Sequence, residues 1–363
     1  MSRARDMANL GASATGGGIG GENIIDNGAF AVDQRNTGSA VTPANATPTF
    51  GPDRWYMYKN TAATFTIDQD TTAPDGFTYS LKVTNTGVDS SISATDRALI
   101  VHRIEGDRIR HLGLGASDAK KVTLSFYVRS SLTGTHGGAF RNHDSNQRVY
   151  AFSYTINDAD TWERKSITLT LDTSGTWPSD NTLGLQIQFG LGVGTDFSTT
   201  AGAWGDGDKN SASGAITTML STSGATWYVT GVQLEVGESA TAFKHKSYAD
   251  DYNDCLRYFW RISRNDNYGE FLPVVRTYSS TNGSGVTLFP VAMRNDPTMA
   301  ISATVNSSNF GYSLSALSIG NSDINHTQCE YFVTGSFTAN GAAVIQKADN
   351  TDLISIDFDA ELD

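Results

Sequence analysis

The sequence predicts an all-β protein with two β-sandwich domains, a jelly roll and a smaller distal sandwich, joined by a short α-helix and preceded by a flexible N-terminal tether. Glycine accounts for 36 of the 363 residues, only 18% of residues are charged and 10% are aromatic, which is typical of many short strands joined by turns. Apolar residues recur mainly with a period of two, the spacing of a strand with one buried face. Long helical patterns are nearly absent, and the chain is long enough for two domains.

Residues 1–22 are predicted to form the tether. Five of the six residues from Gly16 to Gly21 are glycine, so little apolar surface is available to offset the entropy of ordering. The first ten residues could fold onto a partner or stay disordered. Arg3 and Arg5 resemble the start of a secretory signal, but no apolar run follows, so the sequence predicts neither a signal peptide nor a transmembrane span.

Residues 23–246 are predicted to form the jelly roll. The clearest strand is Trp227 to Gly237, in which the apolar residues share one face only if a residue slip, such as a bulge, occurs at Thr230-Gly231. Further strands are expected at Ala63–Ile67, Ser80–Thr84, Val122–Val128, Ser166–Leu171 and Leu183–Phe189. Trp55, Tyr56 and Tyr58 are predicted to be strand residues of the core, with Arg54 beside them in a structural hydrogen bond or ion pair.

Residues 247–268 are predicted to be a helical connector, with the helix running from Ser247 to Arg264. Large side chains recur there at alternating spacings of four and three, in the order Tyr248, Tyr252, Cys255, Phe259 and Ile262. Ser247 and Asp250 fit the start of a capped helix, and arginines follow at its end. This seam either packs against a sandwich within one subunit or lies on the threefold axis of a homotrimer.

Residues 269–363 are predicted to form the distal sandwich. Roughly seven apolar or alternating segments follow one another, which fits a compact antiparallel sandwich. They are Phe271–Val275, Gly285–Val291, Ala300–Val305, Tyr312–Ile319, Glu330–Ala339, Ala342–Ala348 and Leu353–Leu362.

Charge and motif content argue against several functions. The net charge is -12 and the 26 Lys and Arg residues are dispersed, so the sequence predicts no nucleic-acid binding. The two cysteines, Cys255 and Cys329, have no partner at metal-ligand spacing and are predicted to be free thiols. No catalytic motif surrounds the six histidines, and Asp206–Asn210 only imitates the start of a calcium loop, because Ser211 and Thr217 break the pattern. We therefore expect no enzyme activity, no metal site and no cofactor.

Sugar binding needs an aromatic face beside groups that hydrogen-bond hydroxyls. Trp177 and Trp204 lie in turn-rich polar segments, so they are candidates for sugar contact, although each could instead anchor its own loop to the sandwich. The full set of candidates is Trp177, Trp204, Asp206, Asp208 and Asn210 in the first domain and Asn282, Asn309 and Asn325 in polar loops of the distal domain.

Six motifs in order carry a family resemblance. They are Asn23–Phe30 with Asp53-Arg54-Trp55, Val122–Ser131, Thr182–Gly192, Gly202–Ala215, Leu288–Met299 and Phe358–Leu362. Together with the strand and helix at 227–264, they resemble tail fibre and tail tip proteins of tailed bacteriophages, with a carbohydrate-binding-module-like jelly roll. The resemblance covers roughly residues 23 to 363.

The resemblance implies a homotrimeric virion structural protein of the tail that binds bacterial surface polysaccharide during host attachment. It further implies an N-terminal tether that anchors the chain to other tail or virion proteins, synthesis in the host cytoplasm, no membrane insertion and a receptor-binding tip in residues 269–363. Such jelly rolls often hold a structural calcium, but Thr230-Gly231 stands where an Asp is expected, which puts that ion in doubt.

Two alternatives stay open. The chain could be an architectural connector or decoration protein of the virion without glycan binding, since fold does not imply function. It could also be a polysaccharide depolymerase, although no long periodic repeat is present.

Overall fold

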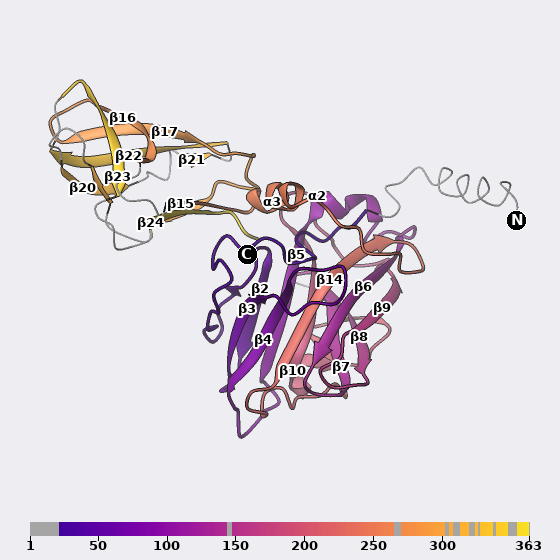
Figure 1. Ribbon diagram of the computed structural model, residues 1–363. Helices are drawn as coiled ribbons and strands as arrows, with labels where there is room; N and C mark the ends of the chain where they lie inside the picture. Colours follow the sequence, from indigo (N-terminus) through magenta and orange to yellow (C-terminus); the bar gives the residue numbers. More distant parts are fainter. Residues whose placement is uncertain are drawn as a thin grey trace, which may run out of the picture. The chain divides into compact units, whose positions relative to one another are not determined.

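The computed structural model describes residues 22–143, 147–264, 270–301, 305–307, 313–318, 324–325, 327–336, 339–347 and 354–362. Apart from Glu22, the predicted tether lies outside the described residues. The chain divides into two compact units, Met1–Asp251 with Leu362–Asp363, and Tyr252–Glu361 (Figure 1). Both are built of antiparallel sheets, so the predicted all-β fold class is confirmed. No helix among the described residues is long and apolar enough to cross a membrane.

The first unit is a sandwich of two antiparallel sheets (Figure 1). The seven-stranded sheet has the order β1 (Thr49–Phe50), β2 (Trp55–Asn60), β5 (Arg97–Glu105), β10 (Leu183–Val193), β7 (Gly134–Arg141), β8 (Arg148–Ile156) and β12 (Trp204–Asp206). The five-stranded sheet has the order β3 (Thr64–Asp70), β4 (Ser80–Gly87), β14 (Thr226–Val236), β6 (Lys121–Ser130) and β9 (Glu163–Thr170). Short elements complete the unit: α2 (Gly106–Ile109), 3-10 turns at Arg110–Leu112 and Thr195–Phe197, and the parallel pair β11 (Ser198–Thr199) and β13 (Ser211–Ala212).

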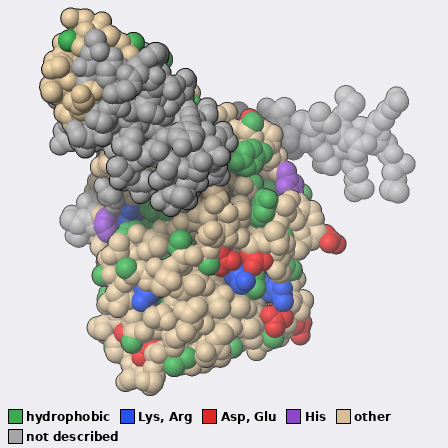
Figure 2. All heavy atoms as spheres, turned by 60° about the vertical axis from the view of Figure 1, so that its left-hand side comes forward, with side chains coloured by type: hydrophobic (Ala, Val, Ile, Leu, Met, Phe, Trp, Pro, Cys, Tyr) green, Lys and Arg blue, Asp and Glu red, His purple; other side chains and the backbone are tan. Residues whose placement is uncertain are grey.

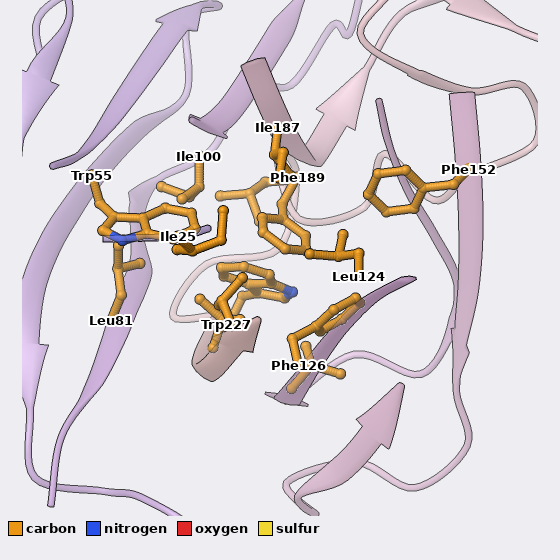
Figure 3. Packing of buried hydrophobic residues seen from close by; sticks show 14 of the residues in the cluster. Ile25, Trp55, Leu81, Ile100, Leu124, Phe126, Phe152, Ile187, Phe189 and Trp227 are labelled. Carbon is orange, nitrogen blue, oxygen red and sulfur yellow. The ribbon is translucent and has the colours of Figure 1, made fainter. Parts of the chain in front are cut away.

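The core of the first unit fills the space between these sheets. Trp227 of β14 and Phe189 of β10 lie on opposite sheets, are both 0% exposed, and have ring centroids 5.6 Å apart. Figure 3 shows them packed together with Phe126 and aliphatic side chains from both sheets. Every second residue of β10, from Leu185 to Leu191, and of β6, from Val122 to Val128, belongs to this core, as the period of two predicts.

The predicted slip in the strand at Trp227 is also confirmed. The pairing of β14 with β6 shifts between Thr230 and Gln233, and Gly231 there has φ +60°. A side chain at this glycine would meet the ring of Phe77 at 2.6 Å, so glycine serves both the backbone conformation and the packing. The start of the unit runs along the same strand, since the amide of Asn23 donates to the carbonyl of Val232 at 3.0 Å.

The predicted helix is wrong in its second half. The helix α3 covers only Tyr248–Leu256, and β15 (Phe259–Arg264) follows it. Its start is as predicted, because the backbone N–H of Asp250 donates to the Ser247 hydroxyl at 3.2 Å.

Phe259 and Ile262 therefore lie on a strand, and the predicted five-residue seam does not exist as one helix face. The cause is pairing over a long sequence distance, since β15 pairs with β24 (Ile354–Asp359) along its whole length. Trp260 stacks on Phe358 with 5.4 Å between centroids, and Arg261 forms an ion pair with Asp357 at 2.6 Å. The helical spacing in this segment is carried by aromatic and β-branched residues, which also favour strands. The contacts with β24 therefore decide its conformation.

The second unit contains two antiparallel sheets. The three-stranded sheet has the order β15, β24 and β18 (Thr298–Ile301). The larger sheet has the order β19 (Val305–Ser307), β23 (Gly341–Lys347), β16 (Glu270–Thr277), β17 (Asn282–Leu288), β22 (Gln328–Ser336) and β20 (Ser313–Ser318), and β21 (Ile324–Asn325) pairs with β22. Trp260, Phe289 and Phe358 form an aromatic cluster in this unit.

The packing between the sheets of the first unit generates a stability prediction. Phe126→Ala should lower the free energy of unfolding by about 3–5 kcal/mol, because Phe126 is 0% exposed and contacts the rings of Tyr154 and Phe189. The matched control is Val88→Ala, at a 44% exposed side chain, which should change stability by less than about 0.5 kcal/mol. Calorimetric melting of both variants checks this, and equal melting temperatures would contradict the assigned core.

Candidate functional site

A groove with a volume of about 180 Å³ lies on the outer face of the seven-stranded sheet. Neighbouring side chains in a strand point to opposite faces, so burial of Trp55, Ile100 and Ile187 in the core turns their neighbours outward. The residues that line the groove are Tyr56, Tyr58, Arg97, Leu99, Val101, Arg103, Arg141, His143, Gln147, Gln186, Gln188, Asp208 and Asn210. They come from β2, β5, β10 and β7 and from the loops after β7 and β12.

Two tyrosine–arginine pairs lie along the β2 and β5 side of the groove. The guanidinium of Arg103 lies 4.9 Å from the centroid of the Tyr56 ring, and that of Arg97 lies 5.2 Å from the Tyr58 ring. Arg97 also lies 3.9 Å above the ring of Phe197. Such cation–π contacts hold each guanidinium in one orientation and each ring in place.

Asp208 holds the other wall of the groove in place. One of its carboxylate oxygens accepts a hydrogen bond from Arg141 at 2.6 Å, and the other accepts one from Arg97 at 3.0 Å. Partial burial raises the pKa of Asp208, but the hydrogen bonds and charges of Arg141 and Arg97 outweigh burial and keep this pKa below its usual range. The carboxylate is therefore ionised at neutral pH, and it fixes the loop after β12 to the sheet.

A chain of amide hydrogen bonds continues across the floor of the groove. Arg97 donates to the side-chain oxygen of Asn210 at 2.9 Å, and the Asn210 amide donates to Gln188 at 2.9 Å. Gln188 in turn donates to Gln186 at 2.8 Å. Asn210, Gln188 and Gln186 are buried, and each is hydrogen-bonded to the next, which makes the floor rigid.

Several charged side chains elsewhere on the first unit are also paired. Seen from one side, the described residues show small groups in which basic side chains lie beside acidic ones (Figure 2). Arg148 illustrates this next to the groove, where it contacts Asp172 at 2.5 Å and Asp206 at 2.8 Å. A second hollow, lined in part by Arg148 and Asp206, shares Gln147 and Asp208 with the groove.

The structure brings three of the predicted candidates to these hollows. Asp208 and Asn210 line the groove, and Asp206 lines the neighbouring hollow. In the second unit, the Asn282 amide donates to Thr281 at 3.0 Å. Asn325 lies on β21, and Asn309 lies outside the described residues.

Trp204 and Trp177 lie against the sandwich instead of lining the groove. Both are half-buried against the core of the first unit, with their rings 5.6 Å apart in an edge-to-face arrangement. The indole N–H of Trp204 donates to the carbonyl of Thr170 at 2.8 Å, and that of Trp177 donates to the carbonyl of Ser174 at 3.0 Å. This geometry favours the loop-anchor interpretation of both side chains.

Several groove residues were missed by sequence reasoning. Tyr56 and Tyr58 were assigned to the core together with Trp55. Tyr56 is buried, as predicted, but both tyrosines lie on the outer face of β2, in a small apolar cluster separate from the layer between the sheets that holds Trp55. The sequence did contain a signal for this arrangement: Tyr56 directly follows Trp55, and neighbouring residues of a strand point to opposite faces of the sheet. Arg54, by contrast, does form the predicted structural ion pair, with Asp26 at 3.4 Å.

Among the described residues, no group of three or more His, Cys, Asp or Glu side chains is placed to hold a metal ion. In the calcium-like segment, the carboxylates of Asp206 and Asp208 are bound to arginines.

No family model and no curated protein matches this chain. Among solved structures, the chain is similar to the enzymatically active domain of tailspike protein 4 of bacteriophage CBA120, at 14% identity and a TM-score of 0.31, over 59% of this chain and 21% of that one. It is also similar to the family 11 carbohydrate-binding module of Clostridium thermocellum in complex with a mixed-linked tetrasaccharide (12%, TM-score 0.28, 57% of this chain and 98% of that one). A third similar structure is the xylan-binding domain of Paenibacillus barcinonensis Xyn10C (10%, TM-score 0.27, 56% and 97%). These are distant likenesses between β-sandwiches, and at such TM-scores they carry no argument about function.

The position of Trp204 generates a prediction about stability. Trp204→Ala should lower the melting temperature by several degrees, because it removes packing against the core and the hydrogen bond to Thr170. Affinity of the groove for any ligand should change much less than stability. A variant with an unchanged melting temperature but weakened ligand binding would instead make Trp204 a contact residue.

Proposed function

We propose that this chain is a non-enzymatic glycan-binding protein whose first unit binds a polysaccharide through the groove on the seven-stranded sheet. The observation that carries the proposal is the composition of that groove, in which tyrosine rings lie beside guanidinium and amide groups on a rigid sheet. Aromatic surface and directed hydrogen-bonding groups are what recognition of a sugar ring requires.

The shape of the groove supports a polymer as the ligand. The outward-facing residues of β2, β5, β10 and β7 form a continuous surface, and the neighbouring hollow extends it past Gln147 and Asp208. Contacts spread over such a surface are individually weak. Several copies on one assembly would convert them into firm attachment through avidity.

The electrostatics of the groove support binding without catalysis. A general acid for glycoside hydrolysis needs a raised pKa, and the two carboxyl groups must flank the scissile bond. Asp208 is the groove's one carboxylate among the described residues, and its pKa lies below the usual range because Arg141 and Arg97 outweigh its burial. A depolymerase would need a different site.

We further propose that the chain acts on the virion of a tailed bacteriophage, as a homotrimeric tail fibre or tail tip subunit that binds host surface glycan. The ordered motifs of the sequence support this role, and the N-terminal segment would join the chain to other tail proteins. The helical seam no longer supports the trimer, since Phe259 and Ile262 lie on β15. The trimer therefore rests on the family resemblance.

The groove generates a binding prediction. Tyr58→Ala should weaken the binding of any polysaccharide that the wild-type protein binds by about 1–3 kcal/mol, because Tyr58 lines the groove and contacts Arg97. Affinity electrophoresis against soluble polysaccharides and binding to host cells measure this. The matched control is Tyr278→Ala, a 47% exposed tyrosine in the second unit that should leave affinity unchanged. Loss of binding in the Tyr278 variant alone would move the receptor site to the second unit.

The oligomeric state generates another prediction. Mass photometry of the full chain at micromolar concentration should give three times the 38.9 kDa mass of one chain. A monomeric mass would contradict both the avidity argument and the role as a trimeric fibre subunit. Glycan binding by the groove would still be tested separately, by the affinity of the Tyr58→Ala variant.

A further inference from the structure

The groove has an excess of positive charge in a strongly acidic protein. Three arginines and one aspartate line it, which leaves two positive charges, whereas the whole chain carries a net charge of -12. The imidazole of His143 adds no charge at neutral pH, because partial burial and the charges of Arg141 and Arg103 lower its pKa. The positive charge of this surface thus contrasts with the rest of the molecule.

The hydrogen-bond donors of two groove arginines are incompletely used. The Nε atoms of Arg97 and Arg103 are buried and have no partner among the described residues. Arg97 uses one terminal nitrogen for Asp208 and Asn210, and Arg103 uses one terminal nitrogen for the carbonyl of Leu362. Each guanidinium therefore keeps its second terminal nitrogen for another acceptor, whereas its buried Nε is out of a ligand's reach.

The carboxylate and amide oxygens of the groove, by contrast, already accept hydrogen bonds. Both carboxylate oxygens of Asp208 accept hydrogen bonds from arginines. The amide oxygens of Gln147, Gln186, Gln188 and Asn210 each accept one from a neighbouring side chain. A ligand that brings acceptors is therefore matched better than one that brings donors.

The two arginines are also spaced along one strand. Arg97 and Arg103 lie six residues apart on β5, which corresponds to about 20 Å at the usual rise per residue. Leu99 and Val101 lie between them on the same face. This spacing fits a chain with recurring acidic groups better than a single charged sugar.

We propose that the polysaccharide bound by this groove is anionic, with carboxylate or other acidic oxygen groups held by Arg97 and Arg103. This inference rests on the proposed glycan-binding function. A guanidinium N–H donates to such groups in charge-assisted hydrogen bonds, which are about twice as strong as neutral ones. The neighbouring Tyr56 and Tyr58 keep the two guanidinium groups in position.

The test compares charged polymers with their neutral counterparts. The full chain is run by affinity electrophoresis against polygalacturonate and its carboxyl-reduced form, and against dextran sulfate and dextran. Retention at least tenfold stronger on a charged polymer than on its neutral counterpart supports the inference, and the responding pair distinguishes carboxylate from sulfate. Equal retention on both members of every pair overturns the inference but leaves glycan binding intact. If neither these polymers nor a polysaccharide panel is retained, the proposed function itself fails.

Variants separate a specific contact from general charge. Arg103→Gln should weaken binding of the charged polymer about tenfold, the scale of one lost charge-assisted hydrogen bond, and leave binding of its neutral counterpart unchanged. Arg110→Gln removes the same charge from an exposed residue outside the groove and should change neither affinity. Equal losses in both variants, or an Arg103→Gln loss shared by the neutral polymer, would overturn the inference.

Discussion

The burial of one apolar layer between the two sheets of the first unit is the constraint on which the rest of that unit depends. Trp227 and Phe189 meet in this layer, from opposite sheets, and both are fully buried. Since side chains alternate along a strand, a slip of one residue would turn every apolar side chain outward. The register is therefore strongly determined, and with it the set of residues on the outer face of each sheet.

The groove follows from that constraint. Burial of Ile100 in β5 turns Leu99 and Val101 outward, and the same parity places Arg97 and Arg103 beside the tyrosines of β2. The proposed binding surface is thus built on strands whose positions the core fixes, while one loop, held by Asp208, closes the wall. A site on such strands is preorganised, so little entropy is lost when a ligand binds.

Local patterns predicted many of the strands, among them β6, β10 and β14, but they missed β5, β7 and β8 of the seven-stranded sheet and did not predict contacts between distant segments. The bulge at Gly231 was visible because the apolar period breaks there, and Asp208 and Asn210 stood out in a polar loop. Arg97 lies more than a hundred residues before Asp208, and no local pattern encodes that pairing. The helix failed for the same reason, since β15 takes its conformation from pairing with β24, about ninety residues later.

The contrast between the acidic chain and its positive groove affects how binding would occur. A net charge of -12 repels an anionic polymer at long range, whereas the arginines of the groove attract it only near contact, since charges are screened beyond about 8 Å at physiological ionic strength. Electrostatics would then contribute little to the association rate, unlike in proteins whose whole surface steers the ligand. Selection would occur at contact, where the second terminal nitrogens of Arg97 and Arg103 bind an acidic group more strongly than a neutral hydroxyl. A bound charged polymer would be retained because it dissociates slowly. Binding by several copies of the chain at once lowers the dissociation rate further.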